Sequence, residues 1–483
     1  MRICWENKFF AFYILFKTNF INKFATISFY MVNEKDFALL TDLYELTMCA
    51  SYFDNKINDI ATFDLFIRDL PTNRSYFIAV GLEDVLNYLK NIKFTNEHVE
   101  YLKSKKIFKN DFLNYLKNFK FAGNVFAMPE GTIFFPNEPI LSVTAPIIEA
   151  QLIETFLLNT INLQTTIATK ASRVVSAAKN NPVVDFSLRR TQGTDAGMKV
   201  ARASYIAGCV GTSNVLAGMK FKIPIYGTMA HSFVMTFEKE EKSFEAYSKT
   251  FPNTSTFLVD TYNTLKGVEK ASFVAKELEK QGHKLKAIRL DSGDLVALSK
   301  SARKILDKKN LKYVQVFGSG NLDEYKIEEL LRKGALIDAF GVGTAMGVSK
   351  DAPYCDVVYK LVELTNHGKL LPTMKLSKGK VTYPGVKQVC RIVDKNGDYA
   401  KDILVLRDEK INGQKLLIKV MEEGKIKYKF PSLREIRKKT TNNFSNLPDK
   451  YKKLRKVAKY KVEISPKLKR LTEKLNKSLQ QKI

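Results

Sequence analysis

Apolar and polar residues follow two different periods in the first part of the chain. Leu39, Leu43 and Leu46 repeat at the period of an amphipathic helix, whereas residues 62–68 (TFDLFIR) alternate as a half-buried strand does. Prolines and glycines cut residues 124–143 into short apolar pieces, which is typical of small antiparallel strands and turns. The pattern predicts an α+β lobe with helices at 37–53, 81–89, 97–102 and 111–116.

The pattern changes after Pro146 and becomes a repeated unit of apolar strand, polar loop and helix. Short apolar strands that alternate with helices form parallel sheets, and a unit repeated this often favours a (β/α) barrel over an open sheet. The strands are predicted at 183–186, 223–226, 257–259, 287–290, 314–317 and 339–342, and the helices at 147–178, 196–208, 268–281, 294–308 and 322–332.

The last part of the chain returns to short strands and then to helices. Residues 357–418 contain apolar runs such as VVYKLVEL and KLLIKV, which predict strands that join the first lobe late in the chain. Basic segments beyond Pro431 have helical spacing. We expect an extension at 1–30, the α+β lobe at 31–146, the α/β barrel at 147–356, a β-rich segment at 357–430 and a basic helical tail at 431–483.

The first 30 residues stand apart from this plan. They contain the apolar run FFAFYILF (residues 9–16), which is too short to cross a bilayer, and no clear signal-peptide cleavage site follows it. Met31 opens a segment that reads like a natural start. We interpret residues 1–30 as a mis-assigned start or a species-specific extension, with a targeting role as the alternative.

The charge of the chain is concentrated near its end. The formal net charge is +28, and residues 425–483 carry 20 Lys and Arg against four acids, so over half of the excess lies there. A basic tail can bind nucleic acid or an anionic surface, but it is also typical of a solvated helical face, which we favour. Five cysteines without a CxxC or zinc-like spacing suit a reduced, cytoplasmic protein.

Two fixed positive charges and an imidazole follow two of the predicted strands. Arg189 and Arg190 lie in the turn after strand 183–186, and Thr228 and His231 follow strand 223–226. In α/β proteins, the chemistry gathers at the carboxyl ends of the parallel strands. These strand ends therefore predict a pocket that binds an anion.

Glycine-rich turns follow the last two predicted strands. Such turns let backbone N–H groups approach a phosphate closely, and the helix that follows adds partial positive charge. Two of them, separated by one strand–helix unit, predict a sugar-phosphate site. The residues expected to bind the sugar phosphate are Arg190, Ser319, Gly320, Asn321, Gly341, Gly343 and Thr344.

Two carboxylates end neighbouring strands. Asp260 and Asp291 can be ligands of Mg²⁺, which prefers oxygen atoms and shares them with a diphosphate, or acceptors for ribose hydroxyls. The alternative is structural, with each carboxylate capping a helix or pairing with Arg289. His231 is one of four histidines, and its neutral imidazole can serve as acid, base, metal ligand or nucleophile, although a lone histidine is more often structural.

Six motifs, in this order, resemble the nicotinate phosphoribosyltransferase family: LLTDLYELTM, FSLRRTQG, GTSNVLAG, GTMAHSFV, RLDSGDL and FGVGT. The resemblance covers about residues 37–388 and leaves out 1–30 and the tail after Pro431. It implies a type II phosphoribosyltransferase fold, an irregular α/β barrel with an N-terminal α+β lobe, in a homodimer that shares its active site. The implied reaction joins nicotinate to 5-phosphoribosyl 1-diphosphate (PRPP), is coupled to ATP hydrolysis and uses Mg²⁺.

The resemblance also implies roles for single residues of the motifs. His231 matches a histidine that ATP transiently phosphorylates, and Arg189 and Asp291 are the other catalytic residues that we expect. Tyr44 would lie against the pyridine ring, from the neighbouring subunit. The further contacts that it implies are with nicotinate (Thr228 and Arg289) and with phosphate (Thr344).

Ser213 in GTSN distinguishes the chain from a sibling family, nicotinamide phosphoribosyltransferase. The sibling carries an aspartate after GT, which accepts a hydrogen bond from a carboxamide but repels a carboxylate, whereas a serine donates to a carboxylate. Quinolinate phosphoribosyltransferase shares the fold, but its two-carboxylate substrate calls for a denser cationic cluster than these motifs contain. We predict nicotinate as the substrate, with nicotinamide as the alternative.

A nucleic-acid-binding protein that acts through the basic tail is the alternative from a different class. It predicts binding that falls steeply with salt and disappears when the chain is cut near Pro431. The ordered motifs favour the enzyme, with small-molecule substrates and without a nucleic-acid or membrane partner. A degenerate enzyme is disfavoured because none of the matched motif residues is missing.

Overall fold

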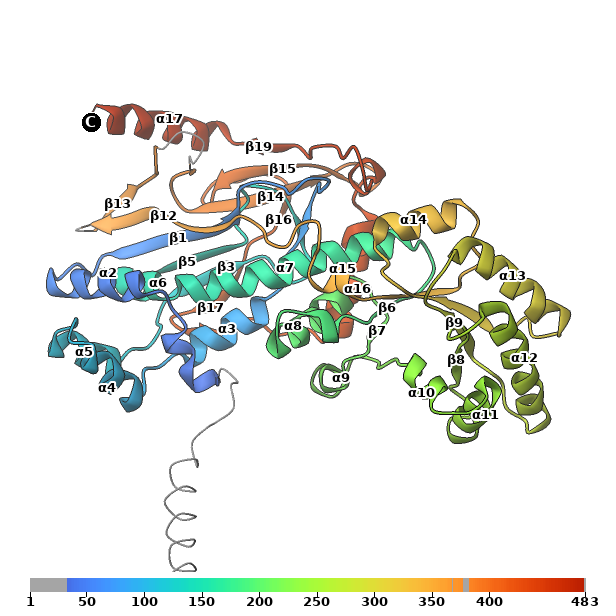
Figure 1. Cartoon of the computed structure of the whole chain (residues 1–483). Coiled ribbons are helices and arrows are strands. Elements are labelled where there is room, and N and C mark those ends of the chain that lie inside the picture. The colour runs from blue at the N-terminus through green and yellow to red at the C-terminus, as the bar shows by residue number, and fades with distance from the viewer. Residues whose placement is uncertain (1–32, 367, 377–381, 482–483) are drawn as a thin grey trace, which may run out of the picture.

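The computed structural model describes residues 33–366, 368–376 and 382–481. The predicted extension at 1–30, with its apolar run, lies outside the described residues. Figure 1 shows an antiparallel sheet at one end of the molecule and a parallel sheet at the other, with the long helix α7 running between them. Among the described residues, no helix is both long and apolar enough to span a membrane.

The antiparallel sheet has seven strands in the order β13-β12-β1-β5-β3-β17-β18. Its centre is β1 (Ile60–Ile67), which pairs with β5 (Leu141–Pro146) and β12 (Val357–Asn366). Every residue of β1 after Ile60 is buried, so the alternating sequence does not mark a solvent-exposed face. The other strands are β3 (Asn124–Ala127), β13 (Lys369–Pro372), β17 (Ile418–Glu422) and β18 (Lys425–Ile426). Late strands therefore join the first lobe, as predicted.

Helices accompany this sheet near the predicted positions, with one break. Residues 37–53 do not form a single helix, because η1 (Glu34–Leu39) ends before Asp42, the residue that precedes α2 (Leu43–Asp54). The Asp42 carboxylate accepts a hydrogen bond of 2.9 Å from Thr155 Oγ1, which holds the residues between the two helices against the helix that contains Thr155. The remaining helices of the lobe are α3 (Leu82–Asn91), α4 (Asn96–Ser104) and α5 (Asn110–Lys117), and a small sheet pairs β2 (Phe77–Ile78) with β4 (Ile133–Phe134).

Helix α7 connects the two parts of the molecule. The predicted helix at 147–178 is divided at Ile153 into α6 (Ile147–Leu152) and α7 (Glu154–Ala177). Most side chains of α7 are buried, including polar ones, because it contacts β12 on one side and α8 and α14 on the other. A buried charge is costly unless it is paired, and Lys170 and Arg173 of α7 both pair with Glu324.

The parallel sheet has six strands in the order β7-β6-β11-β10-β9-β8. The predicted strand at 223–226 is reduced to one bridge between Ile225 and Thr212, because Pro224 has no N–H and contributes only its carbonyl to Thr212. The strands are β6 (Val183–Asp185), β7 (Gly211–Thr212), β8 (Thr256–Leu258), β9 (Ala287–Leu290), β10 (Gln315–Gly318) and β11 (Ala339–Val342).

Helices alternate with these strands as the sequence predicts. Asn263, Asp294 and Asp323 each precede a helix and accept hydrogen bonds from its first backbone N–H groups, so side-chain caps set where the helices begin. The helices are α8 (Thr194–Ile206), α9 (Val215–Phe221), α10 (His231–Met235), α11 (Glu240–Thr250), α12 (Thr264–Lys280), α13 (Leu295–Lys308), α14 (Glu324–Arg332) and α15 (Thr344–Gly347).

The C-terminal segment contains two basic helices, as the sequence predicts, but it also contributes a strand and buried side chains. Between α16 (Leu433–Ser445) and α17 (Pro466–Gln480), β19 (Val462–Ile464) pairs in parallel with β15 (Tyr399–Leu406). These strands belong to a separate four-stranded sheet with β14 (Lys387–Val393) and β16 (Gln414–Lys415), so some late strands do not join the first lobe. The segment is anchored by buried apolar side chains: Leu447, Tyr451, Leu454, Tyr460 and Leu468.

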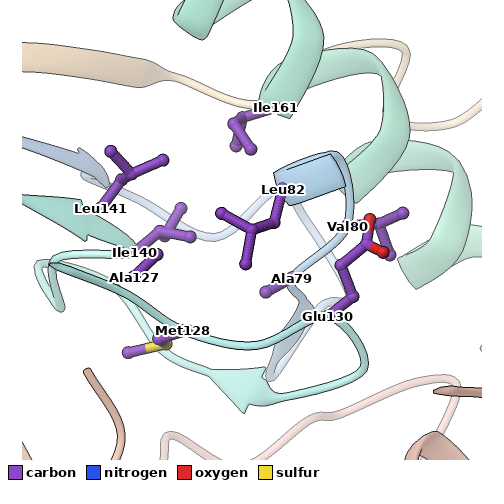
Figure 2. A pocket seen from close by; sticks show the side chains of 9 residues that line it. All are labelled: Ala79, Val80, Leu82, Ala127, Met128, Glu130, Ile140, Leu141 and Ile161. Carbon is purple, nitrogen blue, oxygen red and sulfur yellow. The ribbon is translucent and has the colours of Figure 1, made fainter. Parts of the chain in front are cut away.

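Two hydrophobic cores are built from segments that alternate along the chain. Tyr76 and Ile78 of the first lobe pack in the core of the parallel part, together with Tyr451 and Leu454 from the C-terminal segment. Figure 2 shows a small internal cavity of about 10 Å³ beside the other core, lined by apolar side chains and by Glu130, whose carboxylate pairs with Arg202 at 2.7 Å. This cavity has room for about one water molecule, so it is not a substrate site.

Candidate active site

The carboxyl ends of four neighbouring parallel strands open into one pocket. The strands are β6, β11, β10 and β9, and the turns that follow them line a cavity of about 240 Å³. The structure thus brings together most of the residues predicted at these strand ends. The lining residues are Phe186, Arg189, Arg190, Arg289, Asp291, Ser319, Gly320, Asn321, Gly341, Gly343 and Thr344.

Two glycines of the pocket have no room for a side chain. Gly320 has a φ of 93°, and a Cβ atom there would lie 1.8 Å from the carbonyl oxygen of Asp291. A Cβ atom on Gly341 would lie 2.7 Å from the ring of Phe186. The glycines therefore allow the turns of neighbouring strands to pack directly against one another, and this close packing sets the shape of the pocket floor.

Arg289 connects the side chains on this floor. Its Nε donates to Ser319 Oγ at 2.8 Å, Nη1 to Thr228 Oγ1 at 2.9 Å and Nη2 to Asp291 Oδ1 at 2.6 Å. The guanidinium also lies over the ring of Phe186, 5.6 Å from the ring centroid. Because three of its N–H groups are engaged and one face is covered, Arg289 is held in one orientation with its charge at the pocket.

Asp291 is ionised in this arrangement. Burial raises its pKa, but the hydrogen bond from Ser319 and the positive charge of Arg289 outweigh burial, so the pKa lies below the usual aspartate value. Asp260, which ends the neighbouring strand, accepts hydrogen bonds from Asp291 N at 2.9 Å and from Ser292 Oγ at 2.6 Å. The two predicted carboxylates are therefore adjacent. Both accept hydrogen bonds from the protein, and Asp291 also lines the pocket.

His231 is the first residue of α10 and lies beside this carboxylate pair. Its Nδ1 is 3.1 Å from Thr261 Oγ1, and its charge when protonated would lower the pKa of Asp291. The contact with Thr261 leaves Nε2, on the other edge of the ring, as the nitrogen for a reaction partner. Thr261 was visible in the sequence as the residue after Asp260, but nothing in the sequence marked it as the partner of His231.

The two arginines after β6 lie in a short 3₁₀ helix, η2 (Leu188–Arg190). Buried Asp185 fixes the start of this turn, because its carboxylate accepts from Ser187 N at 2.9 Å and from Thr212 Oγ1 at 2.8 Å. Arg189 and Arg190 are exposed and line the pocket. Sequence reasoning overlooked Phe186 and Asp185, which shape the pocket wall and the turn. The only available signal was their position at the end of strand 183–186.

Five predicted site residues are not among those that line the pocket: Asp260 and His231, described above, and Thr228, Ser213 and Tyr44. Thr228 lies just behind it, bonded to Arg289. Ser213 follows β7, and its backbone N–H donates to the carbonyl of Asp185 at 2.8 Å, which places it next to the turn that carries the arginines. Tyr44 lies on α2, and Figure 1 shows α2 at the opposite end of the molecule from β9 and α10. Within one chain, Tyr44 does not reach the pocket.

Metal binding by the protein alone would need more ligands than the pocket offers. Among the described residues, no cluster of three or more His, Cys, Asp or Glu side chains could hold a metal ion. Asp260 Oδ1, however, is buried and has no hydrogen-bond partner. Mg²⁺ is commonly held by one or two carboxylates together with substrate phosphates, so Asp260 and Asp291 fit a metal ion that arrives with a phosphorylated substrate.

The fold and the pocket together define an α/β protein with a fixed anion pocket at the carboxyl ends of a parallel sheet. Three family models match consecutive parts of the chain: the nicotinate phosphoribosyltransferase N-terminal domain (residues 39–162), the nicotinate phosphoribosyltransferase family (182–401) and the nicotinate phosphoribosyltransferase C-terminal domain (410–472). The chain belongs to the nicotinate phosphoribosyltransferase family. The C-terminal match corrects our expectation that the resemblance ends near residue 388.

Curated relatives cover nearly the whole length. A nicotinate phosphoribosyltransferase of Mycobacterium tuberculosis is 45% identical over 433 residues, which are 89% of this chain and 92% of the relative. A nicotinate phosphoribosyltransferase of Bacillus subtilis is 40% identical over an aligned length of 464, and the match covers 90% of this chain and 94% of the relative. The ranges of the three family models include the pocket residues and most of the C-terminal segment.

Solved structures share the fold. Human nicotinic acid phosphoribosyltransferase is 27% identical with a TM-score of 0.80, and the match covers 90% of this chain and 99% of that one. A nicotinate-nucleotide pyrophosphorylase from Pyrococcus furiosus is 29% identical with a TM-score of 0.70, and the match covers 87% and 98%. The parallel sheet and the antiparallel lobe thus have the arrangement found in this group of enzymes.

Proposed function

We propose that this chain joins nicotinate to PRPP, giving nicotinate mononucleotide and diphosphate in the salvage of NAD, with ATP hydrolysis coupled to the reaction. The observation that carries the proposal is the Arg289 network, which fixes a cation and two glycine-rich turns around one anion pocket in a chain of this family. We further propose that the parallel sheet belongs to an irregular barrel of the type II phosphoribosyltransferase kind. The similarity to the human enzyme supports this proposal.

The pocket divides naturally between the two substrates. The turns after β10 and β11, with Ser319, Gly320, Asn321, Gly341, Gly343 and Thr344, would hold the phosphoribosyl phosphate, together with Arg190. Arg289 would face nicotinate, supported from behind by Thr228, and Arg189 would lie between the ring and the ribose. In the reaction, the pyridine nitrogen forms a bond to ribose C1 while the bond from C1 to the diphosphate oxygen breaks. Fixed positive charge at the departing diphosphate would supply much of the rate acceleration.

His231 would receive the phosphoryl group of ATP. Its free Nε2 would form the bond to the γ-phosphorus while the bond to ADP breaks, and water would later release inorganic phosphate and restore the imidazole. The phosphohistidine would add negative charge next to Asp291 and near Arg289, where it can reorganise the α10 loop during the cycle. The contact of His231 Nδ1 with Thr261, the residue after Asp260, supports this role.

Mg²⁺ would be held by Asp260 and Asp291, the two adjacent carboxylates, of which Asp260 has an oxygen without a partner. When bound with PRPP, the ion would neutralise charge on the departing diphosphate. The protein's own contribution is to keep Asp291 ionised through Ser319 and Arg289, and to fix Asp260 through the backbone N–H of Asp291.

Tyr44 would complete the site from a second copy of the chain in a homodimer. Two observations support this arrangement. Leu40, Leu43 and Tyr44 are exposed around the start of α2. Apolar side chains are also exposed on α9, in the loop after it and on α10: Val215, Leu216, Met219, Ile225, Tyr226 and Met235. Exposed apolar patches of this kind mark interaction surfaces.

A cytoplasmic location would suit the described cysteines, Cys49, Cys209, Cys355 and Cys390, which are free and buried.

The substrate preference would depend on Ser213. A hydroxyl next to the arginine turn can donate to the nicotinate carboxylate, whereas an aspartate would repel it. Nicotinamide remains the alternative substrate. The discriminating experiment incubates the protein with radiolabelled nicotinate or nicotinamide, PRPP and Mg²⁺, with and without ATP, and repeats it with Ser213→Asp.

We expect mononucleotide from nicotinate, stimulated by ATP, and a shift of preference toward nicotinamide in Ser213→Asp. His231→Ala should lose the ATP stimulation and the label transferred from γ-labelled ATP, whereas His283→Ala, which removes a half-buried histidine bonded to Asn253 outside the pocket, should keep both. Product from nicotinamide alone would overturn the substrate assignment, and labelled protein in His231→Ala would overturn the phosphohistidine.

A further inference from the structure

Five charged side chains form a cluster beneath the pocket turns, which we call the five-charge cluster: Arg74, Lys170, Arg173, Glu324 and Asp351. Lys170 Nζ lies 2.5 Å from Glu324 Oε2 and 2.6 Å from Asp351 Oδ1, so one ammonium bridges both carboxylates. All members except Asp351 are less than 5% exposed. Charges this deeply buried are costly unless their geometry is well satisfied, so the cluster calls for an explanation.

The two carboxylates of the cluster end the two glycine-rich turns. Glu324 is the first residue of α14, directly after the turn that contains Ser319 and Asn321, and Lys326 of the same helix donates to the Asn321 carbonyl at 2.8 Å. Asp351 follows α15, the short helix that begins at Thr344 after the other turn. Each turn therefore runs from a strand end to a carboxylate of the same cluster.

The cations of the cluster come from elsewhere in the fold. Lys170 and Arg173 lie one turn apart on α7, and Arg74 comes from the first lobe. Arg74 binds Asp351 with both terminal nitrogens, each at 3.0 Å, and Arg173 Nε donates to Glu324 at 3.1 Å. The two turns are thus tied to one rigid helix and to the other lobe, which fixes the distance between them.

The cluster also carries more positive than negative charge, with three cations and two carboxylates. The remaining contacts of Arg173 are neutral, with Tyr325 OH at 3.1 Å and the Leu454 carbonyl at 3.2 Å. Arg74 and Lys170 hold the Asp351 pKa below the usual aspartate value despite partial burial, so the Asp351 carboxylate stays ionised. Charge in a poorly solvated interior is screened little by salt, so these ion pairs persist at ordinary ionic strength.

We propose that the five-charge cluster positions the two glycine-rich turns for PRPP by fixing their separation. This inference rests on the proposed function, because it takes PRPP as the ligand of the turns. The cluster residues are positioning residues, since their contacts are with the protein and not with the substrate. The proposal predicts a selective effect on PRPP, because nicotinate would be held by Arg289 instead.

The test compares Glu324→Gln and Asp351→Asn with Glu328→Gln, a control on the same helix that removes an exposed ion pair with Arg455. Binding of PRPP with Mg²⁺ is measured by calorimetry, KM is measured for each substrate, and Tm is recorded. We expect PRPP binding to weaken on the order of tenfold in the two cluster variants, with the nicotinate KM changed less than about twofold. Asp351→Glu should recover part of the loss, and the control should bind as the unaltered chain does.

Unchanged PRPP affinity in the folded cluster variants would overturn the proposal, even if their Tm fell, because a purely structural role predicts that result. If Glu324→Gln does not fold, Asp351→Asn decides, since its side chain is 32% exposed and its loss leaves the core intact. If the unaltered chain binds PRPP but forms no mononucleotide, the proposed function is refuted. The PRPP affinities of the variants would then still test the role of the cluster. A chain that binds no PRPP would overturn both.

Discussion

The pocket and the C-terminal segment both carry excess positive charge, and they use it differently. In the pocket, Arg289 makes three hydrogen bonds and is stacked on Phe186, so a single charge has a fixed place and direction. In the C-terminal segment, most lysines are exposed, and several cations pair with nearby acids, as Arg455 does with Glu328 and Lys467 with Asp408.

The comparison shows that the amount of charge in a region says little about its function. Residues 425–483 hold 20 Lys and Arg, yet the contribution of this segment to the described structure comes from its apolar side chains in the two cores. The pocket has few cations, but each lies where parallel strands end. Four predictions follow from this difference, in order of the expected effect.

Ending the chain at Phe430 should abolish folding. Five large apolar side chains of the missing segment are buried, and each contributes about 1.5–3 kcal/mol, so their sum is comparable to the total stability of about 5–15 kcal/mol of a typical domain. Thermal unfolding should show no cooperative transition. A matched truncation that removes only residues 478–483 should fold and keep its activity. A folded, active chain ending at Phe430 would show that the segment is an appendage after all.

Replacing Arg289 by Met should lower kcat/KM on the order of 10²- to 10³-fold, the usual effect of removing one fixed donor from an active site. The loss has a structural reason, because Ser319, Thr228 and Asp291 lose their common partner. Steady-state kinetics with both substrates measure it. Arg332→Met, which removes an exposed arginine of α14, is the matched control and should change kcat/KM less than about twofold. Equal losses of kcat/KM in both variants would mean that activity depends on the total positive charge near the sheet and not on the position of Arg289.

These two regions also show what the sequence could predict. The strand-end residues of the pocket were found because the βα alternation and the glycine turns have local signatures, and parallel strands bring such turns together. Sheet membership in the last third was predicted only in part. Strands β12 and β17 join the first lobe, but β14 and β15 form a sheet of their own, a choice that depends on contacts far apart in the chain.

Local signals also failed where tertiary contacts decide the outcome. Charge and helical spacing suggested a solvated tail after Pro431, whereas Leu447, Tyr451 and Tyr460 are buried there. The five-charge cluster has no sequence signature, because Arg74, Lys170 and Asp351 are widely separated along the chain. The roles of Tyr44, Ser213 and the proposed metal ligands remain predictions, since they depend on a partner chain or on bound substrates.

Asp291→Asn should lower the free energy of unfolding by about 1–3 kcal/mol at neutral pH, because Arg289 loses a charged hydrogen-bond partner. The Asp291 pKa is lowered in the folded protein, so its stabilising contribution is present above the usual aspartate pKa and is lost as pH falls through the lowered value. Thermal unfolding at pH 8, 6, 4 and 3 should therefore show a constant difference between the two proteins at pH 8 and 6, which narrows in the acid range. A difference that grows on acidification would contradict this charge assignment.

The smallest effect should come from the largest change in charge. Replacing Lys469, Arg470, Lys474 and Lys477 of α17 by Gln removes four exposed cations, and Figure 1 shows α17 at the opposite end of the molecule from β9 and α10. At that separation, charges in water are screened within about one Debye length, roughly 8–10 Å at ordinary salt. We expect kcat/KM to change less than about twofold.

The matched change in the pocket is Arg190→Gln, which removes only one cation and should cost on the order of tenfold in kcat/KM for PRPP. Titration with double-stranded DNA at several salt concentrations completes the comparison. Weak binding that the α17 replacements reduce would be the nonspecific attraction expected of any basic surface. Loss of catalysis in the α17 variant, or tight DNA binding that persists at high salt, would instead give this segment a function of its own, because a solvated helical face can produce neither.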